Sequence, residues 1–333
     1  MSALLSISGL VKHFPIRSKL LGRTHGVVRA VDGVTFDVGD GEILGVVGES
    51  GCGKSTTARL LIGLLPCDAG KIMYDGRTIG ENLTLSELRS GVQMVFQDSF
   101  ASLNPRLTVE DSIAFGPKVH GMPDAKARAL TRELMAKVGL EPTRFAGRYP
   151  HELSGGQRQR INIARALAFS PRVVILDEAV SALDKSVEAQ ILNLLLDLKR
   201  EFSLTYVFIS HDLNVVRYIS DRVMVMYLGE VVEIGPVEEI YSHPRHPYTR
   251  ALLAAMPSMN PDRRTEEAPL AGDPPNPINP PPGCRFHTRC PLAEPVCSQG
   301  PLGLHVTGAD GHLAACHMLV SGSGHSRARE VAA

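Results

Sequence analysis

The sequence predicts an α/β protein, in which short apolar strands alternate with helical segments. Residues 42–48, 92–97, 173–177 and 205–210 are short runs rich in β-branched and other apolar residues, which is typical of buried strands. Residues 186–202 carry leucines at helical spacing. Hydrophobic residues make up 44% of the 333 residues and charged residues 21%, a balance that excludes a disordered or fibrous chain.

The charge balance and the apolar runs restrict the function and the location of the chain. Lys+Arg and Asp+Glu both number 35, so nucleic acid is not expected as a partner. No apolar stretch approaches the roughly 18 to 20 residues that span a bilayer, and the N-terminus lacks the pattern of a signal peptide. We therefore expect a cytoplasmic protein. If it works at a membrane, a partner must hold it there.

Proline content divides the chain. Twelve of the 23 prolines lie between residues 257 and 301, a density that prevents regular helices and central strands. We therefore expect one domain over 1–257, a small proline-rich and cysteine-containing region over 258–320, and a disordered tail over 321–333, which is rich in glycine, serine and arginine.

A phosphate-binding loop is expected between strand 42–48 and a helix over 54–65. Its sequence, GESGCGKS, fits G-x-x-x-x-G-K-[ST], whose glycines let backbone N–H groups converge on phosphate oxygens. Lys54 would neutralise the β- and γ-phosphates, and the Ser55 hydroxyl would ligate Mg²⁺. Cys52 is expected to fill space rather than to act as a redox switch. The residues expected to bind nucleotide here are Gly48, Glu49, Ser50, Gly51, Cys52, Gly53, Lys54, Ser55 and Thr56.

A second motif is the apolar strand VVILD followed by a second carboxylate. Asp177 would lie at the carboxyl edge of the sheet, where ligands of open α/β sheets gather, and would help to hold Mg²⁺. Glu178 would accept a proton from an attacking water. Acidic residues commonly end strands, so this motif gains weight only beside the phosphate loop.

A third motif, LSGGQ, opens a helical run that extends to Ala168. Its glycines and serine form a second anion-binding helix start, roughly a hundred residues from the first, which a composite site between two chains would explain. With this motif the chain resembles the nucleotide-binding subunit of an ABC transporter. The residues of the motif, which the resemblance places against ATP bound by a second subunit, are Leu153, Ser154, Gly155, Gly156 and Gln157.

The resemblance assigns four further residues. Phe14 would stack on adenine. Tyr74 is an alternative for that role, and simple core packing is an alternative explanation of Phe14. Gln97 would reach Mg²⁺ and the attacking water, Asp184 would act across the dimer interface, and His211 would contact the γ-phosphate.

The resemblance covers about residues 4–257 and implies an ABC-type P-loop ATPase domain with a mixed-sheet core and a helical subdomain at about 98–168. It also implies two subunits that meet head to tail with ATP between the phosphate loop of one and LSGGQ of the other. Glu178 would activate water, hydrolysis would open the dimer, and the opening would drive the membrane subunits.

The end of the chain resembles the C-terminal region of oligopeptide/dipeptide importer ATPases, on the residues HPYTRALLAAMP at 246–257 and GCRFHTRCP at 283–291. Residues 15–29 resemble the second of the two paired ATPases of such importers. The implied partners are a sister ATPase in a heterodimer, two permeases and an extracytoplasmic substrate-binding protein, with the chain on the cytoplasmic face of the inner membrane. A nickel importer, a soluble ABC-type ATPase and an exporter half are the alternatives; the last would need transmembrane helices in the chain or in a partner.

The C-terminal region contains four cysteines with the spacing C-x5-C-x6-C-x18-C, which fits neither zinc ribbons nor bacterial ferredoxins. Members of the resembled family carry a [4Fe–4S] cluster here. Zinc and unligated thiols remain alternatives, and His287 and His317 are expected at the surface. The four candidate ligands are Cys284, Cys290, Cys297 and Cys316.

Overall fold

The computed structural model describes residues 3–17, 24–256, 272, 275–300, 302–307 and 311–328. The expected domain boundary near 257 and part of the N-terminal segment 15–29 lie outside these residues, so both remain predictions. The chain forms two compact units. The first comprises Met1–Leu5, Val38–Ile43 and Tyr74–Ser210, and the second Ser6–Asp37, Leu44–Met73 and His211–Ala333.

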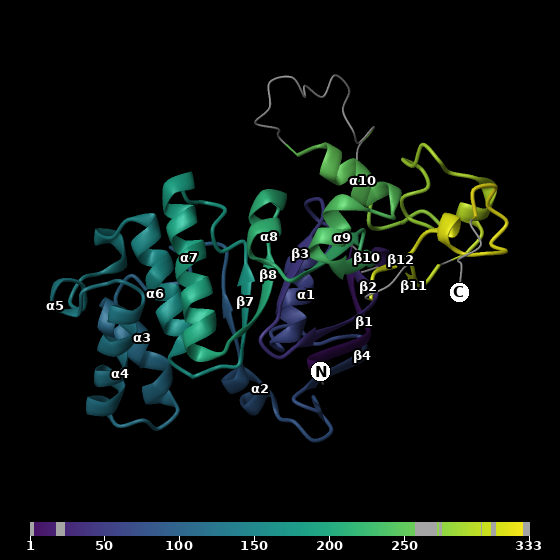
Figure 1. The fold of residues 1–333 in the computed structure, drawn as a ribbon. Coiled ribbons are helices and arrows are strands. Elements are labelled where there is room, and N and C mark those ends of the chain that lie inside the picture. The colour runs from purple at the N-terminus through teal and green to yellow at the C-terminus, as the bar shows by residue number, and fades with distance from the viewer. Residues whose placement is uncertain are drawn as a thin grey trace. The chain divides into compact units, whose positions relative to one another are not determined.

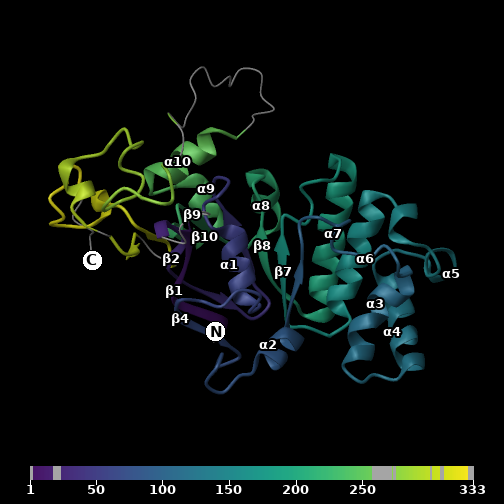
Figure 2. The same cartoon turned by 180° about the vertical axis from the view of Figure 1, so that it is seen from behind.

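The first unit contains a parallel sheet in the order β8-β7-β6 and a group of helices. Helices α3, α4 and α6 pack against one another at one end of this unit, within the predicted helical subdomain at 98–168 (Figures 1 and 2). The elements of the unit are β5 (Arg77–Thr78), α2 (Leu85–Gly91), β6 (Val92–Val95), α3 (Val109–Val119), α4 (Asp124–Lys137), α5 (Pro142–Phe145), η1 (Pro150–Glu152), α6 (Gly155–Leu167), β7 (Val173–Asp177), α7 (Lys185–Phe202) and β8 (Thr205–Ile209).

The buried faces in this unit follow from the sequence pattern. Every residue of β7 and β8 is buried, as expected for central strands with covered faces. Helix α7 buries Ile191, Leu195 and Leu198 at helical spacing and ends at Ser203, which takes the left-handed conformation at φ 50°. The predicted strands and helix of this region are confirmed, although β6 ends at Val95 rather than at residue 97.

The second unit contains two sheets. Strands β2, β1 and β4 are neighbours in one, and the other runs β11-β12-β10-β9-β3, with β3 parallel and β10 antiparallel to β9. Its elements are β1 (Ala3–Arg17), β2 (Thr24–Gly39), β3 (Ile43–Val47), α1 (Lys54–Leu61), β4 (Ala69–Tyr74), α8 (Leu213–Ile219), β9 (Arg222–Tyr227), β10 (Glu230–Pro236), α9 (Val237–Ser242), α10 (Pro247–Ala254), η2 (Pro295–Ser298), β11 (His305–Val306), β12 (Leu313–Ala314) and η3 (His317–Leu319).

Two turns in the second unit show how local chemistry sets element ends. Strands β9 and β10 form a hairpin that turns at Leu228 and Gly229, whose φ values of 45° and 85° suit the tight turns that join twisted antiparallel strands. Helix α1 ends at Leu61 instead of Leu65. Gly63 adopts φ 65° and its N–H donates to Leu60 O (2.9 Å), which closes the helix one turn early.

A buried carboxylate on β10 connects this strand to the residue that precedes the C-terminal strand β12. Glu233 on β10 is fully buried and accepts hydrogen bonds from the N–H groups of Arg245 (2.7 Å) and His246 (2.9 Å) and from the His312 ring (2.7 Å). Burial alone would raise the pKa of Glu233, but these hydrogen bonds, that of His312 foremost, lower it below its usual value.

In the described part of the chain, none of the helices combines the length and the apolar character that crossing a membrane requires.

The Glu233 cluster makes stability depend on pH. Because the pKa of Glu233 is lower in the folded chain than the ordinary value of 4.5, its stabilisation is complete above pH 4.5 and is lost as the pH falls further. We expect Glu233→Gln to lower the free energy of unfolding at pH 7 by about 2 kcal/mol and to weaken its loss in acid. Glu238→Gln, at an exposed ion pair, is the control and should change little. Urea unfolding between pH 7 and 3 measures both; parallel pH curves for wild type and Glu233→Gln would contradict the assignment.

Candidate active site

The loop between β3 and α1 lies where only glycine fits. Gly53 has φ 108°, and a Cβ there would lie 2.2 Å from the Ala30 carbonyl oxygen of β2. A Cβ on Gly48, at φ 148°, would lie 2.2 Å from the Met226 carbonyl oxygen of β9. The loop is thus enclosed by backbone on two sides, so its own N–H groups, rather than side chains, form the surface available to an anion.

Lys54, the first residue of α1, is buried and extends back into this loop. Its Nζ donates to Gly48 O (2.6 Å) and Glu49 O (3.0 Å) and lies 3.7 Å from Cys52 Sγ. The ammonium group therefore adds a positive charge to the helix N-terminus. Cys52 is also buried, and burial raises the pKa of its thiol, as expected of a neutral side chain that fills space. Ser55 and Thr56 follow on the first turn of α1.

Glu49, inside the loop, is held by two residues that the sequence analysis did not assign. Its N–H donates to the Tyr248 hydroxyl (2.9 Å), and its carboxylate forms a two-pronged ion pair with Arg289 (2.8 and 3.1 Å). Tyr248 lies in residues 246–257, which resemble the importer ATPases, and Arg289 lies in the cysteine-containing residues 283–291. No spacing rule connects them to a residue some 200 or 240 positions earlier, so only the fold reveals the contact.

In the first unit, the structure brings two of the predicted catalytic residues together. Glu178 directly follows β7, whose last residue, Asp177, is buried. The Glu178 carboxylate accepts a hydrogen bond from Gln97 Nε2 (2.9 Å), and its N–H donates to Ile209 O (3.0 Å). Glu178 has φ 48°, a conformation that costs a non-glycine residue roughly 1 to 2 kcal/mol and that persists where surrounding contacts impose it.

The LSGGQ motif forms the start of α6. Ser154 is the N-cap: its hydroxyl accepts from Gln157 N–H (3.3 Å), and the Gln157 side chain accepts from Ser154 N–H (3.0 Å). Leu153 is buried beneath the motif. A Cβ on Gly156 would lie 2.5 Å from the Val187 side chain, so this glycine permits close packing against α7.

Asp184 caps α7 beside this helix start. Its carboxylate accepts from Val187 N–H (2.9 Å) and the Ser186 hydroxyl (2.9 Å), and these hydrogen bonds lower its pKa. A Cβ on Gly155 would contact Leu183 at 3.5 Å, so the LSGGQ helix start and residues 183–187 lie side by side.

Phe14 and His211 occupy accessible positions in the second unit. Phe14 on β1 is 36% exposed, and the Lys12 ammonium lies 5.6 Å from its ring centroid. Tyr74 is only 6% exposed, and its hydroxyl donates to Gly91 O (3.5 Å), which leaves Phe14 the more accessible ring. His211 is exposed between the end of β8 and α8. The roles of these residues remain predictions.

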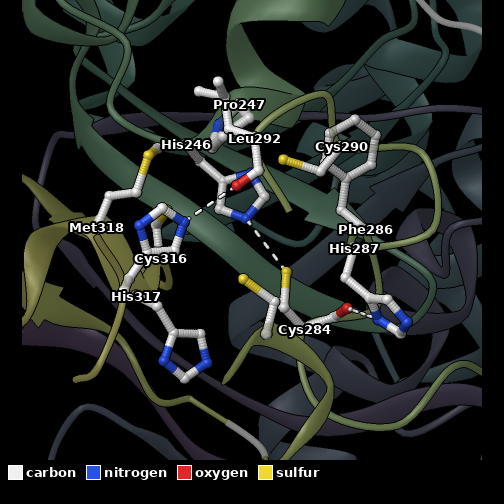
Figure 3. A pocket seen from close by; sticks show the side chains of 12 residues that line it. His246, Pro247, Cys284, Phe286, His287, Cys290, Leu292, Cys316, His317 and Met318 are labelled. Carbon is white, nitrogen blue, oxygen red and sulfur yellow. Dashed lines mark hydrogen bonds between the residues drawn. The ribbon is translucent and has the colours of Figure 1, made fainter. Parts of the chain in front are cut away.

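The four C-terminal cysteines line one small cavity of about 20 Å³, together with His246 and His325. Figure 3 shows the Cys284 thiol directed at the His246 ring, 3.9 Å from Nε2. Burial raises the pKa of Cys284 to about 12 and that of Cys316 to about 11, and it lowers the pKa of His246 to about 4. The Cys284 and Cys316 thiols are therefore protonated at neutral pH.

Four thiols and the Met318 thioether line this one small space. Among the residues that the structure describes, however, no group of three or more His, Cys, Asp or Glu side chains is already placed to hold a metal ion. Binding a metal centre would require the thiols to lose their protons and draw together. His287 and His317, expected at the surface, are partly buried at this cavity.

The glycine loop with its buried lysine, the strand-ending Asp–Glu pair and the LSGGQ helix start define an ATPase of the ABC type. Residues 31–181 match the family model of the ABC transporter, and residues 232–297 match the oligopeptide/dipeptide transporter C-terminal region. The fold resembles cbiO1 of Clostridium perfringens (TM-score 0.63, 27% identity, 73% of this chain and 92% of that one). It also resembles the ATP-binding cassette MJ0796 with ADP and Pi (0.60, 28%, 70% and 98%).

Curated relatives place the chain more narrowly. It is 51% identical to the oligopeptide transport ATP-binding protein AppF of Bacillus subtilis, over 95% of this chain and 97% of that one. It is 50% identical to the oligopeptide transport ATP-binding protein OppF of Salmonella typhimurium, over 89% and 91%. The chain belongs to the ABC transporter family, in the group of oligopeptide/dipeptide transporter ATP-binding proteins.

Replacing the base without changing its shape tests the catalytic assignment. Glu178→Gln keeps a partner for Gln97 but cannot accept a proton, so we expect ATP affinity within about threefold of wild type and hydrolysis about 10² to 10⁴ times slower. Lys54→Ala is the contrasting variant and should abolish ATP binding. Titration with a fluorescent ATP analogue and phosphate release measure the two effects; rapid hydrolysis by Glu178→Gln would remove Glu178 from the role of base.

Proposed function

We propose that this chain is the ATP-hydrolysing subunit of a membrane importer that takes up dipeptides and oligopeptides. The observation that carries the proposal is the union of an ABC ATPase with the oligopeptide/dipeptide transporter C-terminal region in one chain. The names of the relatives, which are oligopeptide transport ATP-binding proteins, support the same cargo.

The phosphate loop and Lys54 bind the triphosphate through N–H groups and one ammonium charge, and Phe14 stacks on adenine. Ser55, Gln97 and Asp177 would hold Mg²⁺, which would neutralise charge on the phosphates. Glu178 takes a proton from water as the water oxygen bonds to the γ-phosphorus and the bond to ADP breaks. Gln97, hydrogen-bonded to Glu178, orients that water, and His211 contacts the γ-phosphate.

A second ATPase subunit completes each site with its LSGGQ helix start. The Ser154–Gln157 cap keeps this helix end in order, and its free N–H groups meet the γ-phosphate of ATP bound to the partner. Asp184, beside the helix start, acts at the same interface. We propose a sister ATPase as the partner, two permeases and an extracytoplasmic peptide-binding protein, with the chain on the cytoplasmic face of the inner membrane.

The four cysteines would hold an iron–sulfur cluster. In support, all four line one cavity. The cluster would supply cross-linking of that segment; nothing in ATP hydrolysis requires it.

Purification of the tagged chain from detergent-solubilised cells tests the assembly. We expect two permeases, a sister ATPase and a peptide-binding protein to accompany it. In proteoliposomes containing this complex, peptides should stimulate ATP hydrolysis and enter the lumen. Stimulation by Ni²⁺ instead would assign a nickel importer, and recovery with ribosomes or DNA would contradict transport altogether.

Removing two of the thiols tests the metal centre. Cys290→Ser with Cys297→Ser should eliminate bound iron and make residues 284–297 sensitive to protease, because two ligands are lost. Cys67→Ser, at an exposed cysteine, is the matched control and should change neither. Iron analysis, visible absorption and limited proteolysis provide the measurements; equal protease resistance with no iron in wild type would refute the cluster.

A further inference from the structure

The phosphate loop carries a negative charge of its own. Glu49 lies in the loop directly after Gly48, and Lys54 Nζ contacts its carbonyl oxygen (3.0 Å). An unneutralised carboxylate in this loop would repel a triphosphate and oppose the helix dipole and the lysine. The loop therefore needs a counter-charge for Glu49.

Arg289 provides that counter-charge. Its guanidinium donates to both carboxylate oxygens of Glu49, at 2.8 and 3.1 Å, and its side chain is only 6% exposed. It also donates to the Tyr227 hydroxyl (3.3 Å). A two-pronged, shielded pair of this kind is stronger and better oriented than a surface ion pair.

An aromatic cluster brings Arg289 to the loop. The rings of Tyr227, Tyr248 and Phe286 are fully buried, with centroids 4.5 to 5.4 Å apart. Tyr248 also accepts the hydrogen bond from Glu49 N–H (2.9 Å), and Arg289 lies 6.0 Å from the Phe286 and Tyr227 ring centroids. Phe286 and Arg289 both belong to residues 284–297, which we call the cysteine segment.

A second arginine of the cysteine segment binds the neighbouring backbone. Arg285 is 6% exposed, pairs with Asp32 and Glu230, and donates to Leu228 O. It thus anchors the segment to β2 and the β9–β10 turn, without contacting Glu49.

We propose that Arg289 is a positioning residue for ATP binding: the docked cysteine segment supplies the guanidinium that neutralises and holds Glu49 of the phosphate loop. This inference rests on the assignment of residues 48–55 as the phosphate-binding loop. Docking of the segment and binding of ATP are then linked, and because such a linkage is reciprocal, MgATP must also stabilise the docked segment. The segment contributes to ATP affinity through the charge of Arg289.

A double-mutant cycle in the full-length chain tests the charge relationship. Arg289→Met should weaken binding of a fluorescent ATP analogue about tenfold, because Glu49 is left uncompensated. Glu49→Gln removes the charge that needs compensation and keeps the loop backbone, and the double variant should bind the analogue as Glu49→Gln does, more tightly than Arg289→Met alone. A purely structural role for Arg289 predicts no such recovery, so equal weakening in the single Arg289 variant and the double variant would overturn the proposal.

Arg285→Met is the matched control, since it removes an equally buried arginine from the same segment but leaves the Glu49 pair in place. It should weaken ATP binding less than Arg289→Met, and equal losses would overturn the proposal. Hydrogen exchange adds the reciprocal readout: MgATP should slow exchange in residues 284–297 of wild type but not of Arg289→Met. If Lys54→Ala did not abolish ATP binding, the assignment of residues 48–55 as the phosphate-binding loop would itself be wrong.

Discussion

The nucleotide site depends on one steric constraint, which is the approach of the phosphate loop to two neighbouring strands. The carbonyl oxygens of Ala30 and Met226 come so close to Gly53 and Gly48 that no Cβ fits at either position. Because side chains are excluded at these two positions, the backbone of the loop stays accessible there, and the buried Lys54 reaches back to the carbonyls of Gly48 and Glu49. The β9–β10 turn is part of the same arrangement, since Gly229 N–H donates to Cys52 O at 2.9 Å. Changes in β2 or in the β9–β10 hairpin are therefore changes in the nucleotide site.

In the first unit, hydrogen bonds hold Glu178 in place, whereas in the second unit steric exclusion shapes the phosphate loop. Glu178 stays in a left-handed conformation because its N–H, its carbonyl and its carboxylate are all engaged, by Ile209, Ser181 and Gln97. The backbone contacts fix the position of Glu178, and Gln97 orients its carboxylate, as the predicted role of general base would require. The strain is local and is offset by these contacts.

The sequence was sufficient for the motifs, the α/β class and the bounds of the buried central strands and of α7, because each depends on local pattern: glycine spacing, buried apolar strands and leucines at helical intervals. The LSGGQ capping box is a further local feature, since Ser154 and Gln157 are three residues apart. Contacts between distant segments could not be predicted. Nothing near Glu49 indicates that its partner is Arg289, and nothing near Glu233 indicates His312. The helix predicted over 54–65 ends early, at Leu61, because Gly63 takes the left-handed conformation that stops it.

The cysteine segment and the nucleotide site share one core, which bears on what the thiols can do. Phe286, the largest fully buried side chain of the segment, packs on Tyr227 and Tyr248. The segment therefore obtains its apolar burial from the same rings that hold the phosphate loop. Burial favours the neutral form of the Cys284 and Cys316 thiols. A metal centre would bind these residues as thiolates, so loading it would be a change within the core that also holds Glu49.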